Sequence, residues 1–344
     1  MKTLNIFACG GAGQNITADL IQTHISIDDR TLADLNIVLV DTSESNYEKN
    51  KKIFDSCGVS LVTIPGLDGS GQIRRANVNS ILPHIGKIIN DHAAVDASLN
   101  IVICSLSGGS GSVIGSLLAK ELLLENRNVI VMAVGDDTTR MFADNTLKSI
   151  QSLQAISKQT NVPVVAHYFQ NSANRMMSNS INGMISGLVL DYRLLFGGCI
   201  HGVDSSDLHN FLNYQKVTSV TPSLTLIDSI AIPAISESSK LREELNNRHG
   251  DDWYAISMIN IQTNKESKLQ DIQCEYRIDG EIEFDSKKEA KDKVNNLYFV
   301  LTDSYFANQA LVLEAKVKEY DKRGNARVEK QIKVEDVDES GLVL

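Results

Sequence analysis

Short apolar runs rich in β-branched residues alternate with amphipathic stretches along the first half of the chain. The runs predict strands at Leu4–Ala8, Asn36–Val40, Val59–Ile64, Leu99–Cys104, Asn128–Ala133 and Val162–Tyr168. Between them, apolar residues recur every three or four positions, which places them on one face of a helix. This alternation predicts an α/β fold, with a doubly wound, mostly parallel sheet covered by helices on both sides.

The second half of the chain has a different pattern. A long periodic segment at 179–201, with Ile181 and Ile185 on one stripe, predicts a central connecting helix. Beyond it we expect strands at Leu224–Ile232, Ala255–Ile261 and Leu297–Leu301, and helices at Glu237–Asn247 and Lys287–Asn296. The expected organisation is a first domain over 1–178, the central helix over 179–201, a smaller α/β domain over 202–315 and a charged segment over 316–344.

Composition narrows the class of protein. Hydrophobic residues make up 42% of the 344 positions and charged residues 22%, which excludes a disordered chain and a small disulfide-stapled scaffold. The net charge of −10 disfavours direct binding to nucleic acid or to an anionic membrane, because the field of the protein repels phosphates. Five scattered cysteines, no C-x-x-C pair and no histidine spacing typical of a metal site predict a cytoplasmic protein without a structural metal.

A glycine-rich loop follows the first predicted strand and runs directly into a helix. It consists of Gly10, Gly11, Ala12, Gly13, Gln14 and Asn15. Glycines let the backbone approach a diphosphate, and the helix terminus offers unpaired N–H groups. Ile16 stands where a nicotinamide-binding G-x-G-x-x-G would need its last glycine, which disfavours a dehydrogenase. A tight turn without a ligand remains the alternative for this loop alone.

Two more glycine loops follow strands of the same predicted sheet. After the fourth strand come Ser107, Gly108, Gly109, Ser110, Gly111 and Ser112, and after the third come Gly69, Ser70 and Gly71. Neither loop contains a lysine, so a phosphate would be held by backbone amides and a metal ion rather than by a Walker-type site. The third loop, where Asp68 could orient water around magnesium, is also typical of a solvated surface loop.

These motifs resemble those of the tubulin/FtsZ superfamily in order and spacing. Ser107–Ser112 is similar to the signature G-G-T-G-[TSA]-G, and Gly10–Asn15 is similar to the first phosphate loop of that family. The segment Gly202–Asp207 resembles its acidic loop N-x-D-x-x-[DE], and Asn182 lies 22 residues before Asp204, where the family places its guanine-reading side chain. The resemblance covers roughly residues 1–230 motif by motif.

The resemblance implies a GTPase that binds GTP or GDP with Mg²⁺. It places Asp41 near the phosphates or the metal, Arg140 or Asn145 near the ribose, and Asn182 at the guanine. It also implies head-to-tail stacking, in which Asp204 and Asp207 of one subunit act on the GTP of the next and produce a filament. Asp41, Arg140 and Asn145 could equally be ordinary loop residues, and two aspartates at a helix start are also typical of capping.

The compact length, the divergent signature and the acidic end most resemble the phage-encoded tubulin-like (PhuZ) group, whose filaments position phage DNA or the phage nucleus in the host cell. In that group an acidic tail docks on the neighbouring subunit, a role open here to Glu335, Asp336, Asp338 and Glu339. Within the superfamily, a plasmid-segregating TubZ-like filament protein is the alternative. Two departures, Val113 in place of a glycine and Gly202 in place of an asparagine, also keep open a non-polymerising GTP-binding regulator.

Overall fold

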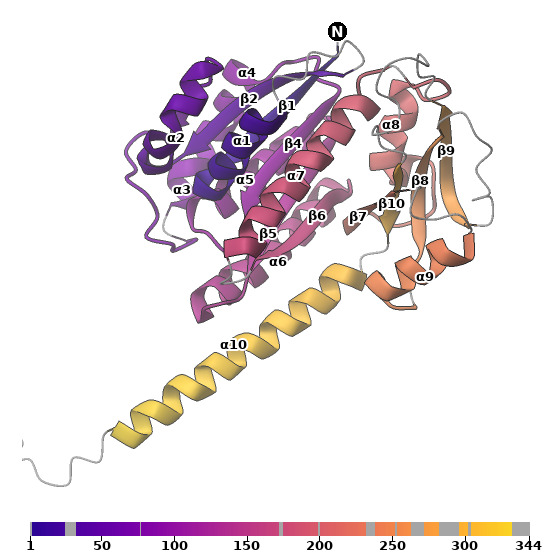
Figure 1. Cartoon of the computed structure of the whole chain (residues 1–344). Coiled ribbons are helices and arrows are strands. Elements are labelled where there is room, and N and C mark those ends of the chain that lie inside the picture. The colour runs from indigo at the N-terminus through magenta and orange to yellow at the C-terminus, as the bar shows by residue number, and fades with distance from the viewer. Residues whose placement is uncertain are drawn as a thin grey trace, which may run out of the picture.

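A single twisted sheet of ten strands organises the computed structural model of the chain (Figure 1). The structure describes residues 2–24, 32–75, 77–171, 175–198, 200–231, 238–251, 253–262, 272–281, 296–301 and 304–331. The strand order is β3-β2-β1-β4-β5-β6-β7-β10-β8-β9, and every pair from β3 to β7 is parallel. The doubly wound, mostly parallel sheet expected from the sequence is confirmed.

The first half of the chain alternates strands and helices in the expected order. The strands are β1 (Thr3–Cys9), β2 (Asp34–Asp41), β3 (Leu61–Thr63), β4 (Leu99–Ser105), β5 (Val129–Asp136) and β6 (Val164–Asn171). The helices are α1 (Gly10–His24), α2 (Ser45–Ser56), α3 (Val78–Ile81), α4 (Ile85–His92), α5 (Ser110–Leu124) and α6 (Arg140–Thr160), with the 3₁₀ turn η1 (Leu82–His84) before α4.

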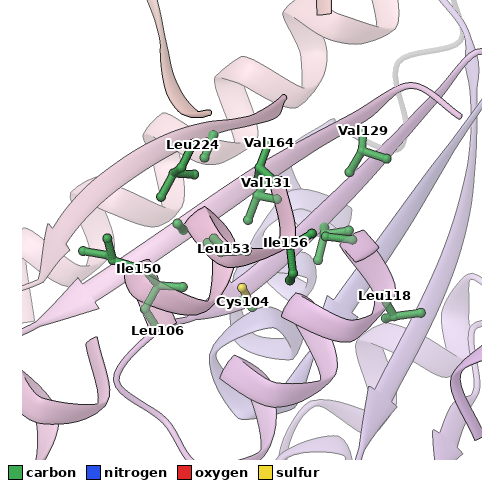
Figure 2. Packing of buried hydrophobic residues seen from close by; sticks show 14 of the residues in the cluster. Cys104, Leu106, Leu118, Val129, Val131, Ile150, Leu153, Ile156, Val164 and Leu224 are labelled. Atoms are coloured by element: carbon green, nitrogen blue, oxygen red, sulfur yellow. The ribbon is translucent and has the colours of Figure 1, made fainter. Parts of the chain in front are cut away.

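Helices α4, α5 and α6 cover one face of the sheet and build the larger core. Figure 2 shows part of it, where Leu153 and Ile156 of α6 lie against Val131 and Val164 of the strands. Apolar side chains every three or four residues on α6 supply its buried face, as the periodicity predicted. The strands carry side chains buried on both faces because helices cover both, which is why they consist of continuous apolar runs.

The other face is covered by α1 and by α7 (Arg175–Leu195), the long central helix. Ile181, Ile185 and Tyr192 of α7 pack with Ile16 of α1 and Ile101 of β4 in a second core cluster. The expected helix over 179–201 therefore exists, but it begins and ends earlier along the chain.

The second half continues the same sheet. Its elements are α8 (Ser205–Leu212), η2 (Tyr214–Lys216), β7 (Leu224–Ala231), α9 (Ser238–His249), β8 (Ala255–Gln262), β9 (Cys274–Glu281) and β10 (Asn296–Leu301). Strand β7 pairs with β6 in parallel and with β10 antiparallel, so it joins the two parts of the sheet. The helix expected at Lys287–Asn296 lies outside the described residues, apart from Asn296, which begins β10.

The last described element is α10 (Ser304–Gln331), which packs along α6 and then projects beyond the body of the molecule (Figure 1). Phe306 and Leu313 are buried where α10 crosses the sheet-covering helices. The helix runs through residue 315, where the sequence suggested a domain end. The acidic residues expected to form the tail lie outside the described residues. Among the helices that the structure describes, none is long and apolar enough to cross a bilayer.

Candidate functional site

A pocket of about 420 Å³ lies at the carboxyl ends of the parallel strands, where ligands bind in open α/β sheets. Its walls come from all three glycine-rich loops. The predicted residues that line it are Gly11, Ala12, Asp41, Gly69, Ser70, Ser107, Gly108, Gly109, Ser110 and Gly111. The structure thus brings together loops that are about a hundred residues apart in the sequence.

Glycine is required in these loops because their backbones touch. A Cβ added to Gly10 would lie 2.8 Å from the Cα of Gly111, and one added to Gly111 would lie 2.6 Å from the carbonyl oxygen of Cys9. Gly10 also has a φ of +69°, a conformation that side chains rarely adopt. The third loop folds over the signature, since a Cβ on Gly109 would lie 2.1 Å from the Ser70 hydroxyl.

Side-chain hydrogen bonds fasten the loops to one another. The buried Asn145 of α6 donates to the carbonyl oxygens of Ser107, at 2.9 Å, and of Gln72, at 3.0 Å. The hydroxyls of Thr42 and Ser110 lie 2.5 Å apart and link the end of β2 to the start of α5. Asn145, expected near the ribose, therefore lies where it holds two phosphate loops together.

Asp41 is the buried carboxylate of the pocket. It accepts hydrogen bonds from the Gln14 side-chain amide at 2.9 Å and from the Thr42 backbone N–H at 2.7 Å. Burial raises the pKa of the Asp41 carboxyl to about 6, although these hydrogen bonds act in the opposite direction. A nearby cation would compensate for this unfavourable burial.

The donor set fits a magnesium ion. Asp41 lines the pocket at the end of β2, and Mg²⁺ in nucleotide sites is usually held through one or two carboxylates, with phosphates and waters completing its shell. Asp136 ends β5, three strands away across the sheet, so one ion could not bind both carboxylates directly. Within the described ranges, no group of three or more His, Cys, Asp or Glu side chains gathers to hold a metal by itself. Any magnesium bound here would therefore depend on the phosphates of a nucleotide.

Several predicted binding residues support the loops and do not face the pocket. Gly13 approaches β4, where an added Cβ would lie 2.7 Å from the Ile103 carbonyl oxygen. The Asn15 side chain accepts from Asn50, and the Ser112 hydroxyl donates to the Gly108 carbonyl at 2.6 Å. Gly71, which has a φ of +54°, also lies outside the lining.

Two predicted residues have other partners in the structure. The Asn182 amide donates to the Asp19 carboxylate, which joins α7 to α1 beside the first glycine loop. The Arg140 guanidinium pairs with Asp321 of α10 at 2.6 Å and does not line the pocket. The geometry therefore gives Arg140 a contact with the C-terminal helix and none with the candidate nucleotide pocket.

Part of the lining lies outside the residues predicted to bind the nucleotide. Cys9, Ser43 and Ser105 stand in or directly beside the predicted loops, whereas sequence reasoning missed Asn46, Gln72, Asp136, Phe142 and Asn171. Asp136 and Asn171 end β5 and β6, and their side chains are joined by a hydrogen bond of 3.0 Å. The rule that carboxyl ends of parallel strands form the site, applied to these two strands as well, would have found both.

The acidic loop lies at the opposite end of the sheet. His209 of α8 bonds to Asn128, which precedes β5, at 2.8 Å, so α8 lies beside the amino ends of the strands (Figure 1). Asp204 caps α8: one of its carboxylate oxygens, Oδ1, accepts from the backbone N–H groups of Ser206 and Asp207. Asp207 returns a bond by accepting from the Asp204 backbone N–H at 3.0 Å. Both aspartates therefore cap α8, and both carboxylates retain exposed surface.

Gly202, the departure from the family motif, has a conformational reason. Its φ is +79°, and a Cβ there would lie 3.1 Å from the Asp279 carbonyl oxygen of β9. The preceding residue, His201, exchanges two backbone hydrogen bonds with Glu281, at 2.8 and 2.9 Å. Val113, the other departure, is buried in the core and does not line the pocket.

The chain is similar to known proteins in part of its sequence and in its fold. No family model matches the sequence. The chain is 26% identical over 222 residues to a phage tubulin-like protein of Pseudomonas phage PhiPA3, a match that covers 61% of each protein. It therefore spans less than two thirds of that relative's length.

Solved structures extend the similarity to the whole fold. The phage tubulin PhuZ with GDP superposes with a TM-score of 0.76 at 20% identity, and the PhuZ201 filament with a TM-score of 0.75 at 19% identity. Each match covers 99% of both chains. The chain therefore has the tubulin/FtsZ fold, and its similarity to phage tubulin-like proteins confirms the resemblance, found in the sequence, to the PhuZ group of that superfamily.

Proposed function

We propose that this chain is a GTP-binding and GTP-hydrolysing cytoskeletal protein that polymerises head-to-tail into dynamic filaments. In this proposal the nucleotide pocket of one subunit is completed by the acidic loop of the next. As in the phage proteins that it resembles, the filament would position phage DNA or the phage nucleus in the cytoplasm of a host cell, with cargo attached through other proteins.

The observation that carries the proposal is the placement of the two half-sites. The glycine loops lie at the carboxyl ends of the strands, and Asp204 and Asp207 lie beside the amino ends. No aspartate of the acidic loop lines the pocket of its own subunit. A repeated head-to-tail contact would bring one half-site against the other, and a contact of this kind that does not close produces a filament.

The pocket is suited to a polyphosphate because of its backbone. Backbone N–H groups at the start of α5 and in the glycine loops can bind phosphate oxygens, and the helix terminus adds partial positive charge. Asp41, at the end of β2, would bind Mg²⁺ beside the phosphates, and the ion would neutralise charge that develops during phosphoryl transfer. Asn182, beside the first loop, remains the proposed reader of the guanine edge.

Hydrolysis also needs a water in line with the γ-phosphate and a group that orients it. We assign this role to Asp204 and Asp207 of the neighbouring subunit. Turnover would then follow assembly, and loss of the γ-phosphate would weaken the contact.

One experiment distinguishes a dynamic filament from a GTP-binding regulator. The parent protein is mixed with GTP while right-angle light scattering and phosphate release are recorded together. A dynamic filament gives scattering that rises and then decays as phosphate appears. A GTP-binding regulator binds GTP with neither signal, and a TubZ-like plasmid filament gives the same signals but would require a DNA-bound adaptor for its role.

Charge-matched variants make the experiment specific. Asp204→Ala and Asp207→Ala are expected to polymerise but to release little phosphate, so their scattering persists. Glu243→Ala removes an exposed carboxylate from the middle of α9, outside both the acidic loop and the pocket lining, and should behave as the parent. Parental phosphate release by both loop variants would refute hydrolysis completed by the acidic loop.

A further inference from the structure

Strand β9 holds the acidic loop through side chains as well as through its backbone. The Tyr276 hydroxyl donates to Oδ1 of Asp207 at 3.1 Å, while Oδ2 of the same carboxylate accepts the Asp204 backbone N–H at 3.0 Å. Both oxygens of Asp207 are therefore engaged, and the plane of the carboxylate is fixed by two donors from different parts of the chain.

Asp204 is held differently. Its hydrogen bonds to Ser206 and Asp207 both use Oδ1, and Oδ2 makes none with the described residues. Asp204 is exposed and Asp207 is half-buried. The orientation of Asp204 is set within the loop itself, whereas that of Asp207 depends on a residue about seventy positions further along the chain.

Strand β9 packs directly against the acidic loop and can therefore hold this orientation. A Cβ added to Gly280 would lie 2.5 Å from Val203 and 2.7 Å from Ile200, so only glycine lets the strand pack against the loop. His201 pairs with Glu281 through two backbone hydrogen bonds. The loop therefore cannot shift without moving β9.

We propose that Tyr276 is a positioning residue that orients the Asp207 carboxylate toward the nucleotide of the next subunit. This inference rests on the proposed GTPase function. It assigns the orientation of one carboxylate of the acidic loop to strand β9. Tyr276 touches no substrate in this scheme, since it acts only through Asp207. Its partner Asn210 and the strand beneath it keep the phenol in place.

The variant Tyr276→Phe removes one hydroxyl and leaves the ring. We expect phosphate release per polymerised subunit to fall by about tenfold, because a catalytic carboxylate that loses a fixed orientation loses much of its effect. GTP affinity measured on unassembled subunits should stay unchanged, because the pocket lies at the other end of the sheet. The thermal midpoint and the critical concentration for assembly should remain close to those of the parent.

The matched control is Tyr254→Phe, which removes another tyrosine–carboxylate interaction in the same domain. Tyr254 contacts Glu275 and not the acidic loop. Its phosphate release should equal that of the parent. A double-mutant cycle distinguishes positioning from a merely structural role. In an Asp207→Ala background, Tyr276→Phe should cause no further loss of phosphate release.

The positioning role of Tyr276 and the proposed GTPase function would be refuted by different results. Parental phosphate release by Tyr276→Phe, or an equal loss in the presence and absence of Asp207, would overturn the positioning role while leaving the GTPase intact. A loss of rate that comes with a lower thermal midpoint, and that Tyr254→Phe shares, would also overturn it. If the parent neither assembles nor releases phosphate with GTP, the proposed function itself fails, and the role of Tyr276 fails with it.

Discussion

Asp41 is expected to destabilise the nucleotide-free protein at neutral pH. Burial raises the pKa of its carboxyl from 3.8 to about 6. In the unfolded chain the group ionises near its ordinary value, so the folded state binds the proton more tightly between these limits. The difference corresponds to about 3 kcal/mol lost from the free energy of unfolding once the pH exceeds both values.

The perturbation that tests this value is Asp41→Asn. An asparagine can still accept the Thr42 backbone N–H, and its amide can donate to Gln14 if that side chain turns over. The turn costs nothing in hydrogen bonds, because Oε1 of Gln14 is buried without a partner. We therefore expect the variant to equal the parent in stability near pH 4 and to exceed it by about 3 kcal/mol above pH 6.

The assay is urea unfolding of both proteins without nucleotide, followed by far-ultraviolet circular dichroism from about pH 4.5 to about pH 7.5. The buried His167, whose pKa burial lowers to about 4, destabilises the fold as the pH falls below about 6.5. That effect is common to both proteins and cancels in their difference. Adding Mg²⁺ and GTP should reverse the order, because the parent would gain a cation partner that the variant lacks.

A difference between the two proteins that does not change with pH would refute the reasoning, because the titration of Asp41 would then not contribute. The control is Asp96→Asn, the same chemical change at an exposed carboxylate outside the pocket, which should leave the free energy of unfolding close to that of the parent. A variant that is less stable at every pH would mean that Gln14 does not turn over and that packing outweighs charge.

Three further predictions concern the loops. Asn145→Ala should lower the free energy of unfolding by about 2 kcal/mol and weaken GTP binding in a fluorescent-nucleotide titration, because two carbonyl oxygens lose their donor. Gly109→Ala should abolish GTP binding in the same titration by displacing the third loop, whereas Gly86→Ala, with open space around it in α4, should bind normally. Gly202→Ala should slow phosphate release while GTP affinity is preserved. An alanine at the φ of +79° would strain the acidic loop, which is remote from the pocket.

The sheet and the phosphate loops could be predicted from the sequence because their physical causes are local. A buried parallel strand such as β4 consists almost entirely of apolar residues, and a glycine loop between a strand and a helix has few structural alternatives. The capping pair at Asp204 and Asp207 was also visible as a spacing of three residues at a helix start. In each case the sequence signal lies within one short segment of the chain.

Strand β9, in contrast, could not be predicted from its sequence. It lies at the edge of the sheet, only Ile278 and Gly280 of its residues are buried, and charged side chains interrupt it, so it forms no apolar run. The pairing of Arg140 with Asp321 joins residues 181 positions apart, and no local pattern indicates such a partner. The resemblance placed Arg140 near the ribose, but the position of α10 determines where its charge lies.

The end of β5 shows how closely the pocket and the C-terminal helix are connected. Asp136 lines the pocket, and the next residue, Asp137, pairs with Lys316 of α10 at 2.6 Å. The Tyr320 hydroxyl donates to the carbonyl oxygens of Asp137 and Thr138. Exposed ion pairs contribute little stability singly, but here three contacts fix one helix against a short loop. A nucleotide that moved Asp136 would therefore act on α10 through the adjacent peptide, just as Asp207 depends on β9. Both the pocket and the acidic loop are therefore held by parts of the chain beyond residue 270, which contribute to the geometry of each end of the sheet.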